Sequence, residues 1–299
     1  MLKLPLSGQG PAQAPADGAC PRCAAGRAAR IEYQVLPAGV CGTALSCALS
    51  VSTPSVGGVR RFVEEDLRGA EFRECELDGA RFVGVVMQDV EIDGLVTRLV
   101  VNGVDVSGYV EAELDRRYPV RLLIRSQEAA DLLDAWRQLD ADWAATISRM
   151  RQTPGVEHQR VNEEWSAVQT LRHLVFVHDS WFRRCCLGST DLFTSIGIGP
   201  SVEPYRQAHG LDLSLEPSLD EVVSVRQAQT AELEYWLESV TPGQLATPAP
   251  VPDDDVWPPY ARGRTVRQCL GTVLNEQWEH HRFTVRDLNL IGHVIPSDS

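Results

Sequence analysis

The stretch LNEQWEHHRFTVRDL, residues 274–288, decides how the C-terminal half of the chain is expected to fold. Its apolar residues recur with the spacing of an amphipathic helix. At about 100° per residue, one stripe of that helix, within about 80°, collects Cys269, Val273, Glu276, His280 and Phe283. The stripe is otherwise made for a core, so Glu276 and His280 place a carboxylate and an imidazole where apolar groups belong.

A carboxylate seldom enters a core unless a partner compensates its charge. Because Glu276 and His280 lie one helical turn apart, they could ligate one divalent cation, which would offset the cost of burying the carboxylate. A buried Glu–His hydrogen bond and an exposed helix face are the commoner explanations, and the spacing alone leaves all three open. The adjacent His281 is rotated by about 100° and is expected to point elsewhere.

Four helices are expected in residues 123–299. The first covers residues 126–151, and a capping box marks the start of each of the other three. The boxes are Ser166–Gln169, Ser218–Glu221 and Thr265–Gln268. Two long irregular stretches interrupt the helices, residues 187–217 and residues 247–264; such long connections often cover a site or a partner surface.

A second motif is EWSAVQTLRHLVFVHDSW, residues 164–181. Together with residues 274–288 it resembles the DinB-like four-helix-bundle superfamily, and within it the branch of the mycothiol-dependent maleylpyruvate isomerases. The resemblance spans about residues 126–290. It implies a metal site of His173, Glu276 and His280, with Trp165 and Ser166 opening the helix that supplies His173.

Periodicity by itself does not select His173. The apolar stripe of that helix lies nearer to His178, and residues 174–177 are apolar all round. His178 is therefore the alternative ligand, and a hydrogen-bonded core histidine is its plain structural interpretation. Asp287, one turn further along the Glu276 stripe, is a candidate to orient a ligand as a hydrogen-bond acceptor.

Two imidazoles and one carboxylate would leave an open position on a tetrahedral Zn²⁺, as in catalytic zinc sites. We therefore expect Zn²⁺, with Ni²⁺ or Fe²⁺ as alternatives for the same ligands. Such a metal lowers the pKa of a bound water or thiol. The resemblance implies mycothiol or a similar thiol as cosubstrate, and a transferase or isomerase that acts on a small molecule. Arg172, Arg282 and Arg286 are candidates to hold an anionic group, although surface charge explains each equally well.

Residues 62–92 carry a repeat of five, in which one large apolar residue recurs at Phe62, Leu67, Phe72, Leu77, Phe82, Met87 and Ile92. Neither the helical nor the strand period produces this spacing. The stretch DLRGAEFRECELDGARF, residues 66–82, resembles the pentapeptide-repeat family, whose fold is a right-handed quadrilateral β-helix. Seven repeats make under two coils, so we expect a short β-helix over residues 58–122, capped by a hairpin at Asn102–Gly103 and leaning on the bundle.

Composition restricts the remaining possibilities. The net charge of -13 argues against general binding to nucleic acid or to anionic membranes, and no apolar run is long enough for a membrane span. Residues 1–57 are rich in Ala, Gly, Pro and Ser and are expected to be disordered or a non-native N-terminal extension. The cysteines at 75, 185, 186 and 269 are typical of reduced thiols, which favours a cytoplasmic protein.

Two interpretations without catalysis compete with the enzyme. Residues 58–115 hold fourteen acidic residues against six arginines, so the coil could be the partner surface of an interaction protein. Alternatively, the metal could stabilise a scaffold that binds a small molecule without chemistry. A homodimer is a further expectation, because bundles of the DinB-like superfamily often pair.

Overall fold

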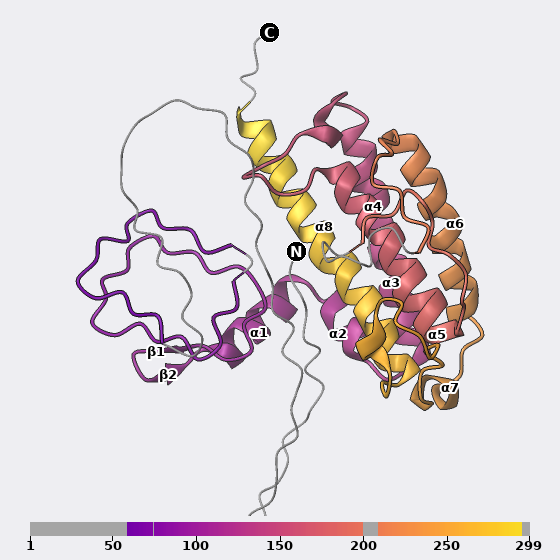
Figure 1. Ribbon diagram of the computed structural model, residues 1–299, viewed down its shortest axis with the longest axis horizontal. Helices are drawn as coiled ribbons and strands as arrows, with labels where there is room; N and C mark the ends of the chain where they lie inside the picture. The colour runs from indigo at the N-terminus through magenta and orange to yellow at the C-terminus, as the bar shows by residue number, and fades with distance from the viewer. Residues whose placement is uncertain (1–58, 74, 200–208, 295–299) are drawn as a thin grey trace, which may run out of the picture. The chain divides into compact units, whose positions relative to one another are not determined.

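The computed structural model describes residues 59–73, 75–199 and 209–294 (Figure 1). The chain divides into two compact units, one containing residues 87–299 and the other ending at Val86. The expected N-terminal extension, residues 1–57, lies outside the described residues. No helix in the described part of the chain is long and apolar enough to span a membrane.

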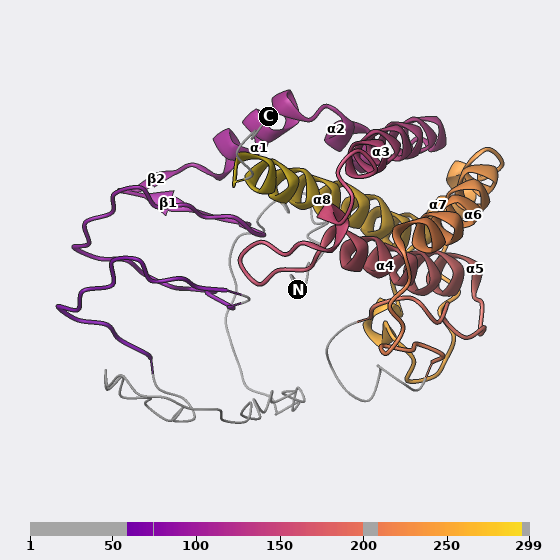
Figure 2. The same ribbon diagram turned by 90° about the horizontal axis from the view of Figure 1, so that it is seen from above.

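Four long helices form a bundle, as the sequence predicts. They are α3 (Ala129–Met150), α4 (Ala167–Val177), α6 (Leu219–Leu237) and α8 (Val266–Val294). Both α3 and α4 pack against α6 and α8, so the four helices close into a ring. Figure 2 shows these helices from above. The predicted starts are confirmed to within a few residues, which fixes the faces that α4 and α8 turn toward each other.

The three predicted capping boxes are all formed. In each, the side chain of the first residue accepts a hydrogen bond from the backbone N–H three residues later. The side chain of that later residue accepts a hydrogen bond from the backbone N–H of the first residue. A fourth box, Thr241–Gln244, opens the short α7 (Pro242–Ala246). Because the boxes satisfy N–H groups that would otherwise be free, they hold the helix starts in place.

Short helical elements surround the bundle, and several of them are not predicted from the sequence. Helices α1 (Ser107–Arg117) and α2 (Val120–Arg125) connect the hairpin to α3. Helix α4 continues as a π-helix, His178–Arg184, and then as α5 (Cys185–Leu187). A π-helix has more residues per turn than an α-helix. The face of any side chain beyond Val177 therefore departs from what helical periodicity predicts.

The core lies between the four long helices. On α8, one face is fully buried through Cys269, Leu270, Val273 and Leu274. The indole N–H of Trp143 on α3 donates a hydrogen bond to the carbonyl oxygen of Gln277, 3.2 Å away. This packing orients α8 so that Glu276 and His280, beside its apolar face, point toward α4.

The N-terminal described segment keeps a five-residue backbone rhythm. Left-handed backbone conformations occur two residues after the large apolar residues, at Glu64, Gly69, Gly79, Gly84, Asp89 and Gly94. At two of these positions the N–H of Ala70 or Ala80 closes a turn onto the carbonyl of Leu67 or Leu77. Glycine suits this turn because its third residue needs a positive φ.

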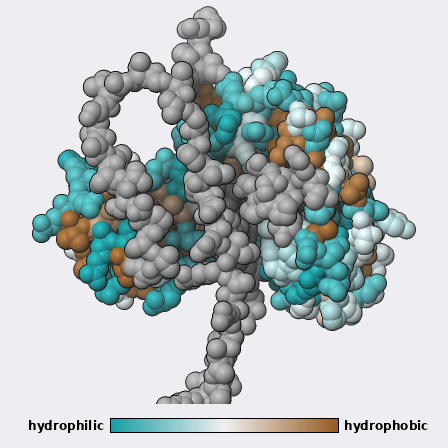
Figure 3. All heavy atoms as spheres, in the orientation of Figure 1, coloured by the Kyte–Doolittle hydropathy of each residue, from teal (hydrophilic) through white to brown (hydrophobic). Residues whose placement is uncertain are grey.

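The predicted β-helix is not shown. The assigned strands in the described residues are β1 (Val100–Val101) and β2 (Val104–Asp105), which pair antiparallel across the predicted Asn102–Gly103 turn. The seven large residues of the repeat were expected to point inward, but their exposed fractions range from 44% to 60%. Figure 3 shows apolar side chains at the surface of this segment. With under two coils, no turn has a neighbour on both sides to cover it.

Burial on α8 predicts a contrast between two leucines of the same helix. We expect Leu270→Ala to lower the free energy of unfolding by about 2–5 kcal/mol, because Leu270 is fully buried and its removal leaves a cavity. Leu290→Ala is the matched control: Leu290 is 46% exposed, so the expected loss is about 0.5 kcal/mol or less. Urea unfolding followed by circular dichroism measures both. Equal losses of unfolding free energy would show that α8 does not bury the face that contains Leu270.

Candidate metal centre

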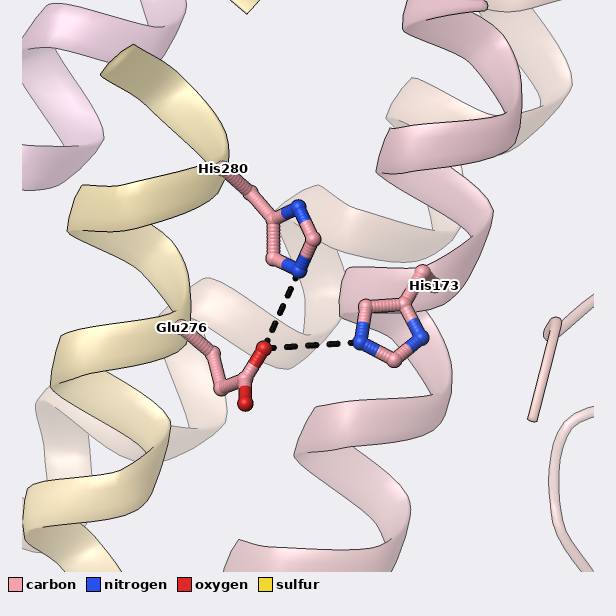
Figure 4. Close-up of side chains that lie close together, drawn as sticks. All are labelled: His173, Glu276 and His280. Atoms are coloured by element: carbon pink, nitrogen blue, oxygen red, sulfur yellow. Dashed lines mark ion pairs between the residues drawn. The ribbon is translucent and has the colours of Figure 1, made fainter. Parts of the chain in front are cut away.

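Helices α4 and α8 bring the three predicted ligands together. The ligating atoms of His173, Glu276 and His280 all lie within 4.8 Å of one another, and this is the one such group among the described residues (Figure 4). The Nε2 of His280 lies 3.0 Å from the Glu276 Oε2, and the Nε2 of His173 lies 3.5 Å from the same oxygen. Both imidazoles therefore turn the same type of nitrogen toward one carboxylate.

The cluster is mostly withdrawn from solvent. The exposed fractions of the side chains are 5% for His173, 14% for Glu276 and 18% for His280. The indole of Trp165, which comes directly before the α4 capping box, has its centroid 5.0 Å from the His173 ring and 6.3 Å from the His280 ring. The two residues of α8 keep most of the remaining exposure.

A backbone carbonyl fixes the tautomer of His173. Its Nδ1 lies 3.0 Å from the carbonyl oxygen of Ile198, and a carbonyl can only accept, so Nδ1 carries the proton. In the neutral imidazole, Nε2 is then an unprotonated lone pair that faces the Glu276 carboxylate. Two acceptors facing each other repel unless a proton or a cation lies between them. Metal-ligating histidines are typically oriented in this way by a hydrogen bond from the other ring nitrogen.

The loop that carries Ile198 is itself pinned to α4. The N–H of Ile198 donates to the carbonyl of Arg172, and the Arg172 Nε donates to the carbonyl of Ile196, 2.7 Å away. This loop belongs to the long stretch 187–217, of which residues 200–208 lie outside the described part. Its described part supplies a hydrogen-bond acceptor to the cluster, which agrees with the expectation that such a connection covers a site.

The charges of the cluster suit a divalent cation. Burial by itself would raise the pKa of Glu276, but the imidazoles of His173 and His280 beside it lower it to about 2. Burial lowers the pKa of His280, so its imidazole is neutral at pH 7. At neutral pH the site thus offers one carboxylate and imidazole nitrogens, which are common ligands of Zn²⁺.

The structure places His178 away from this cluster. It lies in the π-helix, is 2% exposed, and its Nε2 is 3.1 Å from the Oε2 of Glu232 on α6. The carboxylate also binds Arg183, at 2.6 Å. His178 is therefore a hydrogen-bonded core histidine. His281 points to α3, with its Nε2 2.8 Å from the Thr146 hydroxyl, as its rotation on the helix predicted.

The other predicted polar residues have partners of their own. Asp287 accepts a hydrogen bond from Arg286 at 2.8 Å, and it makes no hydrogen bond to any of the three clustered residues. Arg282 pairs with Asp93 at 2.8 Å, and Arg286 also pairs with Glu164 at 2.5 Å. Neither arginine is free to hold an external anion without displacing a carboxylate of the chain.

An aromatic group around Arg264 is not predicted from the sequence. The guanidinium carbon lies 5.3 Å from the Trp181 ring and 5.5 Å from the Tyr260 ring, and the Trp257 ring packs on Tyr260. A sequence feature that could have indicated this group lies in the irregular stretch 247–264, where two aromatic residues flank a pair of prolines. Burial raises the pKa of Tyr260 to about 12, and the charge of Glu276 adds to this effect.

Comparison with family models matches residues 138–283 to the DinB superfamily. The matched interval contains His173, Glu276 and His280. Residues 138–283 are therefore similar to the DinB superfamily, which supports the resemblance drawn from the two sequence motifs. Searches of curated proteins and of solved structures gave no match.

The buried imidazole of His281 predicts acid sensitivity. Burial lowers its pKa below 6.5, so the folded state resists protonation and loses stability as the pH falls from 6.5 toward the folded pKa. The variant His281→Gln can still bond to Thr146 but cannot titrate. In EDTA, we expect its free energy of unfolding to fall less steeply below pH 6.5, by up to about 1.4 kcal/mol per pH unit.

The matched control for this measurement is His158→Gln. His158 is 58% exposed, so the variant should keep the slope of the parent protein. If His281→Gln also kept that slope, the acid sensitivity would have to come from other groups.

Proposed function

We propose that the chain is a metal-dependent enzyme in which His173, Glu276 and His280 hold a divalent cation that activates a thiol. The observation that carries the proposal is the convergence of three ligand atoms within 4.8 Å, with the lone pair of His173 aimed at the carboxylate. Without a cation or a proton between them, that geometry sets two hydrogen-bond acceptors against each other.

The donor set fits the proposed metal. Two imidazole nitrogens and one carboxylate oxygen match the ligands of catalytic zinc sites and leave a position for a substrate. Zn²⁺ is the first choice, and Ni²⁺ or Fe²⁺ would accept the same ligands. The negative charge of Glu276 would be offset by the cation, which removes the cost of keeping a carboxylate largely buried.

No thiol of the described residues belongs to this centre, so we assign the reacting thiol to a separate molecule. Cys185, Cys186 and Cys269 are buried free thiols of the core, and Cys75 is exposed in the repeat segment. None of these four belongs to the cluster. A divalent cation held there would lower the pKa of a thiol beside it and so increase the thiolate fraction at neutral pH. The resemblance to the maleylpyruvate isomerase branch favours mycothiol or a similar low-molecular-weight thiol.

The surrounding side chains support this role without taking part in bond changes. Ile198 holds the His173 ring through its carbonyl, which keeps Nε2 directed at the cluster. Trp165 lies over both imidazoles and excludes water from one side. A transferase or an isomerase that uses the thiol as a nucleophile is the reaction class that this arrangement serves.

A second candidate is a metal-stabilised binding protein without catalysis. The observation that favours it is the acidic repeat segment, whose apolar side chains are half-exposed and would be covered by a partner. Such a protein would bind the metal through the same three residues. The two candidates differ in whether a thiol reacts.

Metal binding should distinguish the two histidines of the α4 segment. We expect the purified protein to bind about one equivalent of Zn²⁺, and His173→Ala to weaken this by more than the roughly 10–100-fold that loss of an outer partner costs. His178→Ala is the matched control. It should keep the metal while losing about 1–3 kcal/mol of stability, because Glu232 loses a partner.

Isothermal titration calorimetry with Zn²⁺ measures the affinity, and thermal unfolding with and without the metal measures the stabilisation. At a free Zn²⁺ concentration 100 times the dissociation constant, the parent protein should gain about 2.7 kcal/mol. The proposed ligand set would be contradicted if His173→Ala bound Zn²⁺ as tightly as the parent protein, or if His178→Ala no longer bound Zn²⁺.

Thiol activation should follow the metal. We expect the Zn²⁺-loaded protein to accelerate conjugation of a small thiol to 1-chloro-2,4-dinitrobenzene about tenfold or more at pH 7, because lowering a thiol pKa from 8.5 to near 7 raises the thiolate fraction by that factor. EDTA should stop the acceleration, Zn²⁺ should restore it, and Glu276→Gln should lack it. Metal and thiol binding without any acceleration would favour the second candidate.

A further inference from the structure

Asp179 is a buried carboxylate whose hydrogen bonds reach beyond its own helix. It lies in the π-helix and is 4% exposed. One carboxylate oxygen, Oδ1, accepts from the side chain of Gln229 at 3.0 Å and from that of Arg183 at 3.1 Å. The other oxygen, Oδ2, accepts from the backbone N–H of Thr194 at 2.7 Å. The carboxylate therefore ties the π-helix to the Ile198 loop, residues 194–199.

The Ile198 loop lies along one stripe of the helical segment that contains His173. Arg172, Phe176 and Asp179 follow one another at i, i+4 and i+7, which places them within about 60° on the helix. At one end of the stripe, the Nε of Arg172 donates to the carbonyl of Ile196, 2.7 Å away. At the other end, Asp179 holds Thr194. The stripe thus anchors the loop at two points.

Two glycines let the loop backbone lie close to the middle of this stripe. A Cβ at Gly197 would come 3.3 Å from the Cβ of Phe176 and 3.1 Å from the carbonyl oxygen of Thr194. A Cβ at Gly199 would come 2.9 Å from the side chain of Leu211 and 3.2 Å from the Phe176 ring. The N–H of Gly197 also donates to the Thr194 carbonyl at 2.9 Å, which closes a turn. The loop therefore follows the surface of the helix closely.

The two side-chain anchors are the strong ones. Each is a hydrogen bond to an ionised group, and such bonds are roughly twice as strong as those between neutral groups. Both have a donor–acceptor distance of 2.7 Å. The backbone bond from the Ile198 N–H to the Arg172 carbonyl is longer, at 3.2 Å, and joins two neutral groups. Without the side chains, that single backbone bond would have to keep the loop in register.

We propose that Asp179 and Arg172 are positioning residues that clamp the Ile198 loop. Held in this way, the loop keeps its carbonyl on the Nδ1 of His173, so the lone pair of Nε2 stays directed at Glu276. Neither clamp residue is assigned a contact with metal or substrate. The effect of the clamp on the His173 tautomer does not require a metal. The effect on metal affinity rests on the proposed function.

The protonated ring nitrogen of His173 is the direct measure of the clamp. Two-bond ¹H–¹⁵N correlation NMR identifies it in full-length, ¹⁵N-labelled, EDTA-treated protein at pH 8, where an imidazole of ordinary pKa is neutral. The variant His173→Gln assigns the signal. We expect the proton on Nδ1 in the parent protein. Asp179→Ala and Arg172→Met should each admit the other tautomer, and the double variant should show it most strongly.

Arg183→Gln is the matched control. It removes another partner of the Asp179 carboxylate but leaves the bond to Thr194 in place. We expect a lower free energy of unfolding and an unchanged His173 tautomer. Asp179→Asn keeps an oxygen that can accept from Thr194, so it should retain the tautomer that Asp179→Ala loses. If Asp179→Ala does not fold, Arg172→Met tests the clamp from its other end.

The Zn²⁺ affinity connects the clamp with the proposed function. By isothermal titration calorimetry, we expect Asp179→Ala and Arg172→Met each to bind Zn²⁺ about 10–100-fold more weakly than the parent, as when a ligand loses its outer hydrogen-bond partner. Removing the charge of Arg172 would by itself favour a nearby cation. Weaker binding by Arg172→Met would therefore have the sign that lost positioning predicts.

The outcomes separate the clamp from the metal. A His173 proton that stays on Nδ1 in the double variant would overturn the clamp, and Zn²⁺ binding by the parent would leave the proposed function standing. The same tautomer change in Arg183→Gln would also overturn it, because general loosening of the bundle would then be the cause. A change confined to the clamp variants, in a protein that binds no Zn²⁺, would support the clamp and reject the proposed function.

Discussion

The charge of Glu276 is the constraint on which the arrangement of α4 and α8 depends. A carboxylate that is 14% exposed needs partners, and α8 alone supplies one of them, His280, a turn away. The second partner, His173, comes from α4. The polar cluster therefore forms only when these two helices pack against each other. A change in the rotation of either helix would separate the three ligand atoms.

The sequence predicts α8 well because its signals are local. The capping box at Thr265 fixes where the helix begins, and the apolar face fixes how it is turned, so the pairing of Glu276 with His280 follows from spacing. The second-helix ligand does not follow in the same way. The π-helix that begins at His178 breaks the α-helical period, and periodicity favoured a residue that the structure places beside Glu232.

Long-range pairing explains the other differences between sequence and structure. Arg282 and Arg286 look available in the sequence, but Asp93 and Glu164, more than a hundred residues earlier, neutralise them. Arg264 lies in an irregular stretch with no periodic pattern, so only the folded chain shows its rings and its unpaired nitrogen. In the repeat segment, the period of five predicts where the backbone turns, whereas burial depends on how many coils stack.

The acceptor that orients His173 is a main-chain carbonyl, and this has an evolutionary consequence. Because every amino acid supplies the same carbonyl, the identity of the residue at position 198 can drift without changing the tautomer of His173. The length of the loop, in contrast, is constrained by the position of this carbonyl. Inserting or deleting one residue between Thr194 and Gly199 would shift the carbonyl away from the ring while leaving all three clustered side chains intact. Homologous chains that share this centre should therefore vary in the residue at position 198 more than in the length of this loop.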